Sequence, residues 1–164
     1  MNLFLLRHGL AVEPTIPGFK LDRDRPLTSA GRKKIRGLAT LFRRLEISFD
    51  LLLASPYARA HQTAVIIAEG LGAQKALEIS THLTPGASPK PLLEALNRRG
   101  SHLADVLLVG HEPDLSRLIS VLVTGKTGLA LEMKKGGLCR LEIAKLHYGR
   151  CAMLQWLIAP KLWS

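Results

Sequence analysis

Apolar residues form short continuous runs that alternate with segments of helical period along the chain. Three runs, at residues 3–6, 51–54 and 105–109, are apolar at almost every position. Such runs are typical of strands that are buried on both faces of a parallel sheet. Residues 76–80 form a weaker strand candidate. The alternation predicts a mostly parallel sheet that is covered by helices on both faces.

Apolar residues recur at helical spacing between these runs. Helices are predicted in four segments: a helix capped by Thr28 that extends to Leu45, one that follows Pro56 and ends near Gly70 or Gly72, one over residues 89–99, and one over residues 115–123. Residues 12–26 contain three prolines and mixed charges, so this stretch is predicted to be a loop.

After Gly125 the pattern changes to short apolar stretches that are joined by turns. Residues 129–133, 138–144 and 151–157 are predicted strands, and we expect them to extend the sheet in antiparallel orientation. The whole pattern predicts an α/β protein with three layers, α/β/α. A length of 164 residues suits one domain, which we expect to span residues 1–164.

The composition is that of a globular protein. Hydrophobic residues make up 47% of the chain and charged residues 22%, unlike the profile of disordered chains. No apolar run approaches the roughly 18 residues that a membrane span needs. The run at residues 1–6 lacks a preceding basic region and stops at Arg7, so we interpret it as a strand rather than a secretory signal. We expect a cytoplasmic protein that does not enter a membrane.

A formal net charge of +10 favours anionic ligands: nucleic acid, phosphorylated metabolites, acidic proteins or anionic lipids. A nucleic-acid-binding module is disfavoured, because aromatic residues make up only 5% of the chain and no aromatic and basic stripe or zinc-finger spacing occurs. Cys139 and Cys151 form no CxxC pair, and we expect both to be small buried side chains. A bridge across a hairpin is conceivable, but a reducing compartment argues against it.

Three of the apolar runs end in polar motifs. The first ends in Arg7-His8-Gly9, the second in Ser55-Pro56 with Arg59 one turn into the next helix, and the third in Gly110-His111. In a parallel sheet these motifs all lie at the carboxyl edge, where such sheets bind ligands. Two histidines, two arginines and a helix N-terminus then converge on one crevice.

These groups fit the chemistry of phosphoryl transfer. Guanidiniums and a helix N-terminus offer N–H donors for phosphate oxygens. A neutral imidazole can attack phosphorus and carry the phosphoryl group, and a second, protonated imidazole can stabilise the charge on its oxygens. Gly9 and Gly110, next to the two histidines, let a ligand approach the backbone closely. No aspartate cluster marks a metal site in the sequence, and we expect neither a metal nor a cofactor.

The sequence resembles the histidine phosphatase superfamily, which includes phosphoglycerate mutases and many phosphatases. The resemblance rests on four motifs in order: Leu6-Arg7-His8-Gly9; Pro26-Leu27-Thr28 with Gly31; Ser55-Pro56 through Arg59-Ala60 to Gln62-Thr63-Ala64; and Gly110-His111-Glu112-Pro113. It implies a phosphoglycerate mutase-like fold. The short length and the form Arg25-Pro26-Leu27-Thr28 are most similar to the SixA-type phosphohistidine phosphatases.

The resemblance implies a role for each matching residue. His8 matches the nucleophilic histidine, which becomes phosphorylated. Arg7 and Arg59 match the two phosphate-binding arginines, and His111 matches the second histidine, which contacts the phosphoryl group. Together these four residues form the expected catalytic set.

Two further residues receive weaker assignments. Arg25 lies in the loop before the first helix, where we expect it to guard the pocket mouth and bind substrate. We expect Ser55 to cap or orient the helix that carries Arg59 rather than to react.

One departure from the family pattern concerns the general acid. Many members carry a Glu or Asp after the third strand that protonates an alcohol leaving group, but residues 83–90 contain no carboxylate. An alkoxide normally needs such an acid, which contributes about 10²–10⁴-fold. A phosphorylated imidazole can leave as neutral imidazole, because its other ring nitrogen can already be protonated. The departure therefore favours phosphohistidine, and the short chain leaves no room for the cap that larger members place over small molecules.

The leading hypothesis is a phosphohistidine phosphatase that acts on a signalling or phosphotransfer protein through a phospho-His8 intermediate. The resemblance implies a histidine phosphotransfer domain as the partner, and a phosphotransferase-system protein is an alternative partner. We expect the protein to be a monomer. The alternative is a phosphomonoesterase for a small metabolite or nucleotide. That activity needs an acid, such as Glu112 or an Asp within residues 22–24.

Overall fold

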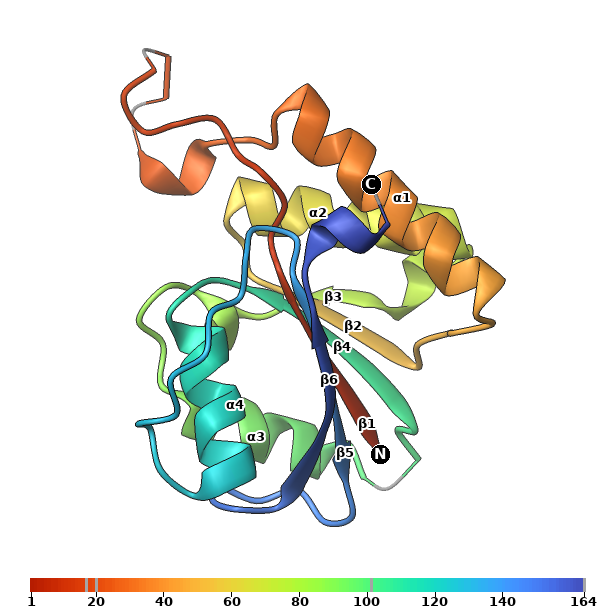
Figure 1. The fold of residues 1–164 in the computed structure, drawn as a ribbon, viewed down its shortest axis with the longest axis vertical. Helices are drawn as coiled ribbons and strands as arrows, with labels where there is room; N and C mark the ends of the chain where they lie inside the picture. The colour runs from red at the N-terminus through yellow and green to blue at the C-terminus, as the bar shows by residue number, and fades with distance from the viewer. Residues whose placement is uncertain (17, 20, 101, 164) are drawn as a thin grey trace.

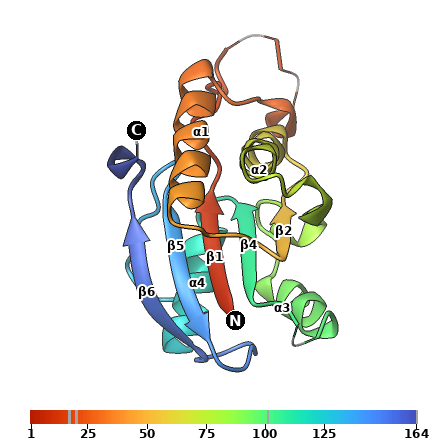
Figure 2. The same ribbon diagram turned by 90° about the vertical axis from the view of Figure 1, so that its right-hand side faces the viewer.

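The computed structural model describes residues 1–16, 18–19, 21–100 and 102–163. A six-stranded sheet forms the middle layer, with helices on both of its faces (Figures 1 and 2). The strands are β1 (Asn2–Arg7), β2 (Leu51–Ala54), β3 (Leu77–Ile79), β4 (Asp105–Gly110), β5 (Leu138–Ile143) and β6 (Ala152–Ile158). The helices are α1 (Ser29–Arg44), α2 (Ala58–Leu71), α3 (Pro89–Arg98) and α4 (Asp114–Thr124), with 3₁₀ turns η1 (Asp22–Asp24), η2 (Gln74–Ala76), η3 (Thr81–Leu83) and η4 (Pro160–Leu162). Within the described ranges, no helix is both long enough and apolar enough to cross a membrane.

The strand order in the sheet is β3-β2-β4-β1-β5-β6. β4 pairs in parallel with both β1 and β2, and β3 pairs in parallel with β2. β5 pairs antiparallel with β1, and β6 pairs antiparallel with β5. Helices α1 and α2 lie on one face of the sheet, and α3 and α4 lie on the other (Figure 1). The predicted three-layer fold with antiparallel C-terminal strands is therefore confirmed.

The continuous apolar runs fill two cores, one on each face of the sheet. In β1, Leu3 and Leu5 belong to the core under α3 and α4, whereas Phe4 and Leu6 belong to the core under α1 and α2. Side chains alternate between the faces of a strand, so a strand that is covered on both faces is apolar at successive positions. The residues of β2 and β4 divide between the two cores in the same way.

The start of α1 is fixed by two residues. The hydroxyl of Thr28 accepts a hydrogen bond from the backbone N–H of Gly31 at 3.0 Å, as the sequence predicts for an N-cap. A Cβ added at Gly31 would lie 2.2 Å from the carbonyl oxygen of Leu10. Only glycine therefore allows the chain that leaves β1 to approach the helix this closely.

The strand predicted over residues 129–133 is wrong. This segment has no regular secondary structure, and both edges of β5, the strand that follows it, are taken by β1 and β6. Its alternating pattern reflects packing instead, since Met133 is 1% exposed and joins the core under α3 and α4. The carbonyl of Met133 accepts a hydrogen bond from Nη1 of Arg7 at 2.7 Å, so the segment supports a predicted site residue.

The loop predicted over residues 12–26 is confirmed for the residues described, and Pro17 and Lys20 lie outside them. Its regular structure there is the single turn η1. The N–H of Val12 donates to the carbonyl of Pro26 at 2.9 Å, which joins the two arms at the base of the loop. Beyond this base the loop projects from the body of the protein (Figure 1).

Both cysteines are free. Cys139 is buried in β5, where burial raises the pKa of its thiol to about 12. Cys151 is half-buried. The prediction of small buried side chains is therefore confirmed for Cys139 and holds only in part for Cys151.

Candidate active site

The carboxyl ends of three neighbouring strands bring predicted site residues together. β4 lies between β2 and β1 in the sheet. Where β1 ends, the N–H of His8 donates to the carbonyl of Gly110 at 3.1 Å, and where β2 ends, the N–H of Ser55 donates to the carbonyl of Val109 at 3.0 Å. The ring centroids of His8 and His111 lie 5.1 Å apart. The predicted convergence at this edge of the sheet is therefore present.

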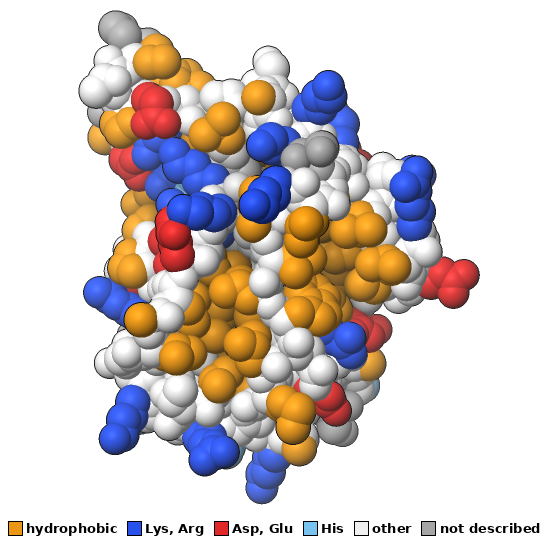
Figure 3. All heavy atoms as spheres, viewed as in Figure 1, with side chains coloured by type: hydrophobic (Ala, Val, Ile, Leu, Met, Phe, Trp, Pro, Cys, Tyr) orange, Lys and Arg blue, Asp and Glu red, His pale blue; other side chains and the backbone are white. Residues whose placement is uncertain are grey.

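An open hollow of about 320 Å³ lies at this edge. Its lining comes from the ends of β1 and β4, the start of α2, the loop over residues 12–26 and two further turns: Arg7, His8, Ala11, Glu13, Pro14, Asp22, Arg25, Arg59, Pro85, His111, Glu112 and Lys135. Figure 3 shows Lys and Arg side chains gathered in this region, below the projecting loop. Five of the predicted site residues therefore share one hollow: Arg7, His8, Arg25, Arg59 and His111.

Gly9 does not line the hollow, contrary to its predicted contact with substrate. It is buried, and a Cβ at this position would lie 2.9 Å from the side chain of Ile35 in α1. Its N–H donates to Oγ1 of Thr63 at 3.1 Å, and that hydroxyl donates to the carbonyl of Arg59 at 2.7 Å. Glycine is therefore required here for packing against α1, and Thr63 couples the turn after β1 to α2.

The two ring nitrogens of His8 have different partners. Nδ1 lies 2.8 Å from the carbonyl oxygen of Gly9, and because that oxygen can only accept, Nδ1 carries the proton. Nε2 therefore has a lone pair, and Nε of Arg59 donates to it at 3.2 Å. This tautomer leaves Nε2 as the atom that can attack an electrophile.

The ring of His8 is neutral at neutral pH. Burial is the main cause that lowers its pKa to about 3, the hydrogen bond to Gly9 opposes the shift, and His111 and the arginines of the site add to it. A protonated ring has no lone pair at Nε2, so the low pKa keeps this nitrogen able to attack.

Arg7 and Arg59 are held by different parts of the fold. Arg59 lies in the first turn of α2 and is 5% exposed. Arg7 ends β1, and Met133 fixes its Nη1. Nε of Arg7 is buried with no hydrogen-bond partner among the described residues. Arg7 therefore keeps a donor that a bound anion can use.

An acidic side chain of the loop lies against two arginines. Oδ2 of Asp22 accepts from Nη2 of Arg59 at 3.0 Å, and the Asp22 carbonyl accepts from Nη1 at 2.8 Å. Oδ1 of Asp22 accepts from Nε of Arg25 at 2.9 Å. Burial alone would raise the pKa of Asp22, but the hydrogen bonds from Arg25 and Arg59 outweigh burial and lower the pKa. Asp22 is therefore a carboxylate at neutral pH and has no proton to give.

Arg25 is one of the residues that line the hollow. Its Nη1 donates to the carbonyl of Val12 at 2.6 Å, and its Nε holds Asp22. Arg25 therefore spans the two arms of the loop.

His111 follows β4 and is 3% exposed. Its Nε2 lies 2.9 Å from Oγ of Ser55, and the same oxygen accepts from the N–H of Tyr57 at 3.3 Å. The Ser55 hydroxyl has one proton to donate, and the acceptor within its reach is Nε2 of His111. Nε2 therefore carries the lone pair, and we assign the ring proton of His111 to Nδ1. Nδ1 is buried with no hydrogen-bond partner among the described residues. An N–H donor is therefore left available beside His8.

In the free protein the second imidazole, His111, is neutral rather than protonated. The pKa of His111 is lowered to about 4: burial is the main cause, Arg59 and Arg7 add to the shift, and Asp22 opposes it. The ring is therefore neutral at neutral pH. The depth of burial that causes this shift does not appear in the sequence motif.

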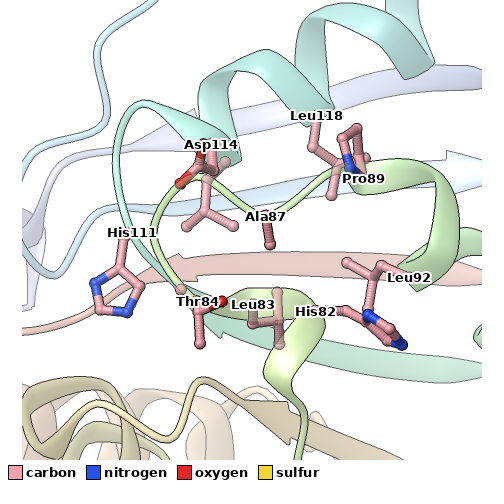
Figure 4. A pocket seen from close by; sticks show the side chains of 11 residues that line it. His82, Leu83, Thr84, Ala87, Pro89, Leu92, His111, Asp114 and Leu118 are labelled. Carbon is pink, nitrogen blue, oxygen red and sulfur yellow. The ribbon is translucent and has the colours of Figure 1, made fainter. Parts of the chain in front are cut away.

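Residues 83–90, which lack a carboxylate, lie beside His111 (Figure 4). With the start of α4 they enclose a narrow crevice of about 20 Å³. Figure 4 shows the carboxylate of Asp114 in this crevice, and its Oδ2 accepts from the N–H of Gly86 at 2.8 Å. Asp114 therefore fixes the turn before α3 and does not line the hollow.

Two more carboxylates line the hollow. Glu112 accepts from the N–H and the hydroxyl of Ser116 at 3.2 and 2.6 Å, in the first turn of α4. Glu13 pairs with Lys135 at 3.4 Å. Both carboxylates therefore have partners of their own. In the ranges that the structure describes, no three His, Cys, Asp or Glu side chains are grouped so that they could hold a metal ion.

Comparison with known proteins identifies the family. The family model described as the histidine phosphatase superfamily (branch 1) matches residues 3–84. The chain is also 30% identical to the phosphohistidine phosphatase SixA of Escherichia coli over 130 residues, which are 77% of each protein. This chain belongs to the histidine phosphatase superfamily. It is therefore a phosphatase, and the resemblance to the SixA type is confirmed.

Solved structures of histidine phosphatases agree with the fold. The structure of the protein histidine phosphatase SixA with tungstate covers all of both chains, with a TM-score of 0.81 and 25% identity. A putative alpha-ribazole-5'-P phosphatase from Escherichia coli covers 98% of both chains, with a TM-score of 0.72 and 22% identity. The phosphoglycerate mutase-like fold is thus shared by phosphatases of different names.

Two polar residues of this histidine phosphatase site have more contacts than the sequence motifs predict. Asp22 stands three residues before Arg25, a spacing that allows the pair, but its contact with Arg59 depends on the path of the loop. Ser55 holds the N-terminus of α2 as predicted, and its second contact, with His111, depends on β2 and β4 being neighbours.

Proposed function

We propose that this histidine phosphatase hydrolyses phosphohistidine on a protein through a covalent phospho-His8 intermediate. The observation that carries the proposal is the state of His8. Its buried ring is neutral, its proton lies on Nδ1, and it lines a hollow that also contains three arginines. Phosphoryl transfer needs an attacking lone pair and donors for the phosphoryl oxygens, and this set supplies both.

In the first step, Nε2 of His8 attacks phosphorus. The bond between phosphorus and the imidazole nitrogen of the substrate breaks, and its electron pair stays on that nitrogen. Nδ1–H remains on His8, so the phosphorylated ring is positively charged, and the carbonyl of Gly9 stabilises this charge. Nε of Arg59 loses its acceptor when the lone pair bonds phosphorus, and the donor turns to a phosphoryl oxygen.

His111 and Arg7 supply further donors to the phosphoryl group. Among the described residues that line the hollow, the Nδ1–H of His111 and the Nε–H of Arg7 are buried donors without partners. A phosphoryl dianion raises the pKa of a nearby imidazole, which opposes the effect of burial on His111. Both donors are fixed before the substrate arrives, so little reorganisation accompanies the reaction.

The carboxylates of the hollow discriminate between leaving groups. Asp22 is ionised between two arginines, Glu13 pairs with Lys135, and Glu112 accepts from Ser116. None of these three carboxylates is held in a protonated form that could donate a proton to a leaving alkoxide. Phosphohistidine leaves as neutral imidazole when its other ring nitrogen is protonated. This arrangement favours a phosphoramidate over an alkyl phosphate.

In the second step, water attacks the phosphorus of phospho-His8. The bond from phosphorus to Nε2 breaks, and its electron pair returns to Nε2 of His8. The oxygen and both protons of the water leave with the phosphoryl group as dihydrogen phosphate. Neither step of the proposal draws on a metal ion or a cofactor.

The names of relatives support the substrate class. SixA of Escherichia coli is a phosphohistidine phosphatase, and the SixA structure holds tungstate, an oxyanion similar to phosphate. The fold also serves a phosphatase named for alpha-ribazole-5'-P, so the choice of substrate depends on the site and not on the fold. A histidine phosphotransfer domain or a phosphotransferase-system protein stays the predicted partner, and a cytoplasmic location and a monomeric state also stay predictions.

Substrate comparison tests the proposed function. Phosphate release by the wild type is measured from a protein phosphorylated on histidine, from p-nitrophenyl phosphate and from glycerol phosphate. We expect kcat/KM for the phosphohistidine protein to exceed that for glycerol phosphate by at least about 100-fold, because the ester lacks a general acid. Equal or faster release from glycerol phosphate would instead indicate a phosphomonoesterase, and loss of that activity in Glu112→Gln would identify its acid.

A further inference from the structure

The loop over residues 12–26 exposes apolar side chains beside the hollow. The loop lines the hollow with Pro14 where it leaves and with Asp22 where it returns. Three large apolar side chains between these points are exposed: Ile16 by 50%, Phe19 by 37% and Leu21 by 47%. Figure 3 shows apolar side chains on this projecting part, above the gathered Lys and Arg side chains. We call Ile16, Phe19 and Leu21 the apolar tip.

The apolar tip does not serve the interior of the protein. None of its three side chains belongs to, or packs against, either core cluster of the described residues. Exposed apolar side chains that are scattered singly are ordinary, but a group of them next to a functional site marks an interaction surface. A loop of this kind otherwise carries polar residues, because exposed apolar area is unfavourable in water.

The two arms of the loop are bonded to each other and to the hollow. Ala11 and Leu27 form a β-bridge, and Arg25 bonds the carbonyl of Val12 on the opposite arm. Asp22, next to Leu21, is bonded to Arg59 in the hollow. Leu21 therefore lies one residue from a side chain that is bonded in the hollow, so the tip adjoins the place where the phosphohistidine enters.

We propose that the apolar tip is a docking surface for the protein that carries the phosphohistidine. The partner contacts the tip while its phosphorylated side chain enters the adjacent hollow. This inference rests on the proposed function and adds the place where the partner binds. A single phosphorylated metabolite that fills the hollow has no need of apolar area beyond the rim, whereas a protein surface around a phosphohistidine covers both.

Basic residues next to the loop define the rest of the partner's surface. Lys33 and Lys34 are exposed in the first turns of α1, which follows the loop. Arg23 in η1 is also exposed, where it pairs with Asp24 at 3.8 Å, and Lys135 lines the hollow, where it pairs with Glu13. The surface that fits is an apolar patch bordered by acidic side chains, with the phosphohistidine beside it.

Paired substrates test the docking surface. The variants Ile16→Ser and Phe19→Ser are compared with the wild type on a histidine phosphotransfer domain phosphorylated on histidine and on free N-phosphohistidine. We expect KM for the domain to rise about tenfold, which corresponds to about 1.4 kcal/mol. The values of kcat/KM for free N-phosphohistidine stay within about twofold, because the small substrate does not reach the apolar tip.

Two exposed apolar residues elsewhere provide matched controls. Leu45 is 58% exposed and follows the far end of α1, roughly 24 Å along the helix from its start. Met153 is 67% exposed in β6. We expect Leu45→Ser and Met153→Ser to leave both substrates unaffected. Thermal unfolding of each variant confirms that the fold is intact.

Each other outcome overturns a defined statement. An equal loss of kcat/KM with both substrates would mean that the loop acts on the reacting group as a lid. Unchanged kinetics with the domain would mean that the tip does not contact the partner. An equal rise in KM for the domain in the control variants would mean that the loss of any exposed apolar side chain weakens binding, wherever that side chain lies. If the wild type cleaves phosphohistidine in neither form, the proposed function is wrong, and the docking surface falls with it.

Discussion

Asp22 and Arg59 are joined by two hydrogen bonds at the mouth of the hollow, from Nη2 to Oδ2 at 3.0 Å and from Nη1 to the Asp22 carbonyl at 2.8 Å. Nε of the same guanidinium donates to Nε2 of His8 at 3.2 Å. Both terminal nitrogens therefore face the loop while Nε faces the nucleophile. Asp22 thus has two opposing effects: it orients Arg59, and it puts a negative charge where we propose that the phosphoryl group binds.

Asp22→Asn separates these two effects. We expect kcat for phosphohistidine to fall about tenfold, because a carboxamide holds the guanidinium less firmly than a half-exposed carboxylate does. Inorganic phosphate should inhibit at a lower concentration, because the competing charge is gone. Steady-state kinetics with phosphate as product inhibitor measure both quantities.

Asp24→Asn is the control for this variant. Asp24 lies in the same turn, and its ion pair is with Arg23, at 3.8 Å. We expect this variant to behave as the wild type. Weaker inhibition by phosphate in Asp22→Asn would contradict the competing role, and an unchanged kcat would contradict the orienting role.

Ser55→Ala should reduce turnover through His111. The hydroxyl of Ser55 holds Nε2 of His111, so its removal frees the ring proton to move from Nδ1 to Nε2. We expect kcat to fall by about 10- to 100-fold, near the effect of removing one oxyanion donor. Nitrogen NMR of the His111 ring reports the position of the proton. Ser120→Ala removes another buried hydroxyl, away from the hollow, and serves as control. Full activity of Ser55→Ala with the proton still on Nδ1 would refute this role.

Acid should destabilise the protein through its two buried imidazoles. The pKa of His8 is lowered to about 3 and that of His111 to about 4, whereas both are near 6.5 in the unfolded chain. The unfolded chain binds these protons first. Each ring therefore contributes its full stability above pH 6.5, and this contribution is lost as the pH falls through the folded pKa. The free energy of unfolding should fall by up to about 1.4 kcal/mol per pH unit for each ring.

Urea unfolding over a series of pH values measures this loss. His8→Gln and His111→Gln should each show a shallower decline below pH 6.5 than the wild type. His147 is exposed, and His147→Gln should follow the wild type. Parallel curves for the wild type and the two site variants would show that the rings are not buried as neutral groups.

Salt should slow the reaction with a protein substrate. The net charge of +10 attracts an acidic partner, and salt screens this attraction over about 10 Å at 0.1 M. We expect kcat/KM for a phosphorylated acidic domain to fall with rising salt, more steeply than for free N-phosphohistidine. The double variant Lys33→Gln with Lys34→Gln should flatten this dependence, whereas Lys126→Gln should not. Equal salt dependence for both substrates would argue against steering by the surface.

The sequence predicts the helices and strands whose pattern of apolar and polar residues is set by their immediate surroundings. β1 and β4 are covered on both faces, so their apolar runs are unambiguous. Thr28 and Gly31 fix the start of α1 through contacts within a few residues. Residues 129–133 mislead because the same apolar spacing suits a strand and an irregular segment that packs Met133 into the core. Which of the two forms depends on the fold as a whole.

The candidate site shows the same division. The convergence of His8 and His111 follows from the rule that parallel strands end at one edge. The neutrality of His111 and the place of Asp22 depend on burial and on the path of a loop, and neither is encoded in a short motif. The position of Gly9 next to His8 predicts close approach of a ligand, although its small size serves the contact with α1.

The transfer of the phosphoryl group to Nε2 of His8 is the central claim. A protein carrying radioactive phosphohistidine is mixed with the wild type or with His8→Ala and quenched in alkali within a single turnover. We predict radioactive phosphate on the peptide that contains His8 in the wild type, followed by release of inorganic phosphate, and neither label nor release with His8→Ala. Release of phosphate by His8→Ala at the rate of the wild type, with no label on the wild-type peptide, would contradict the claim.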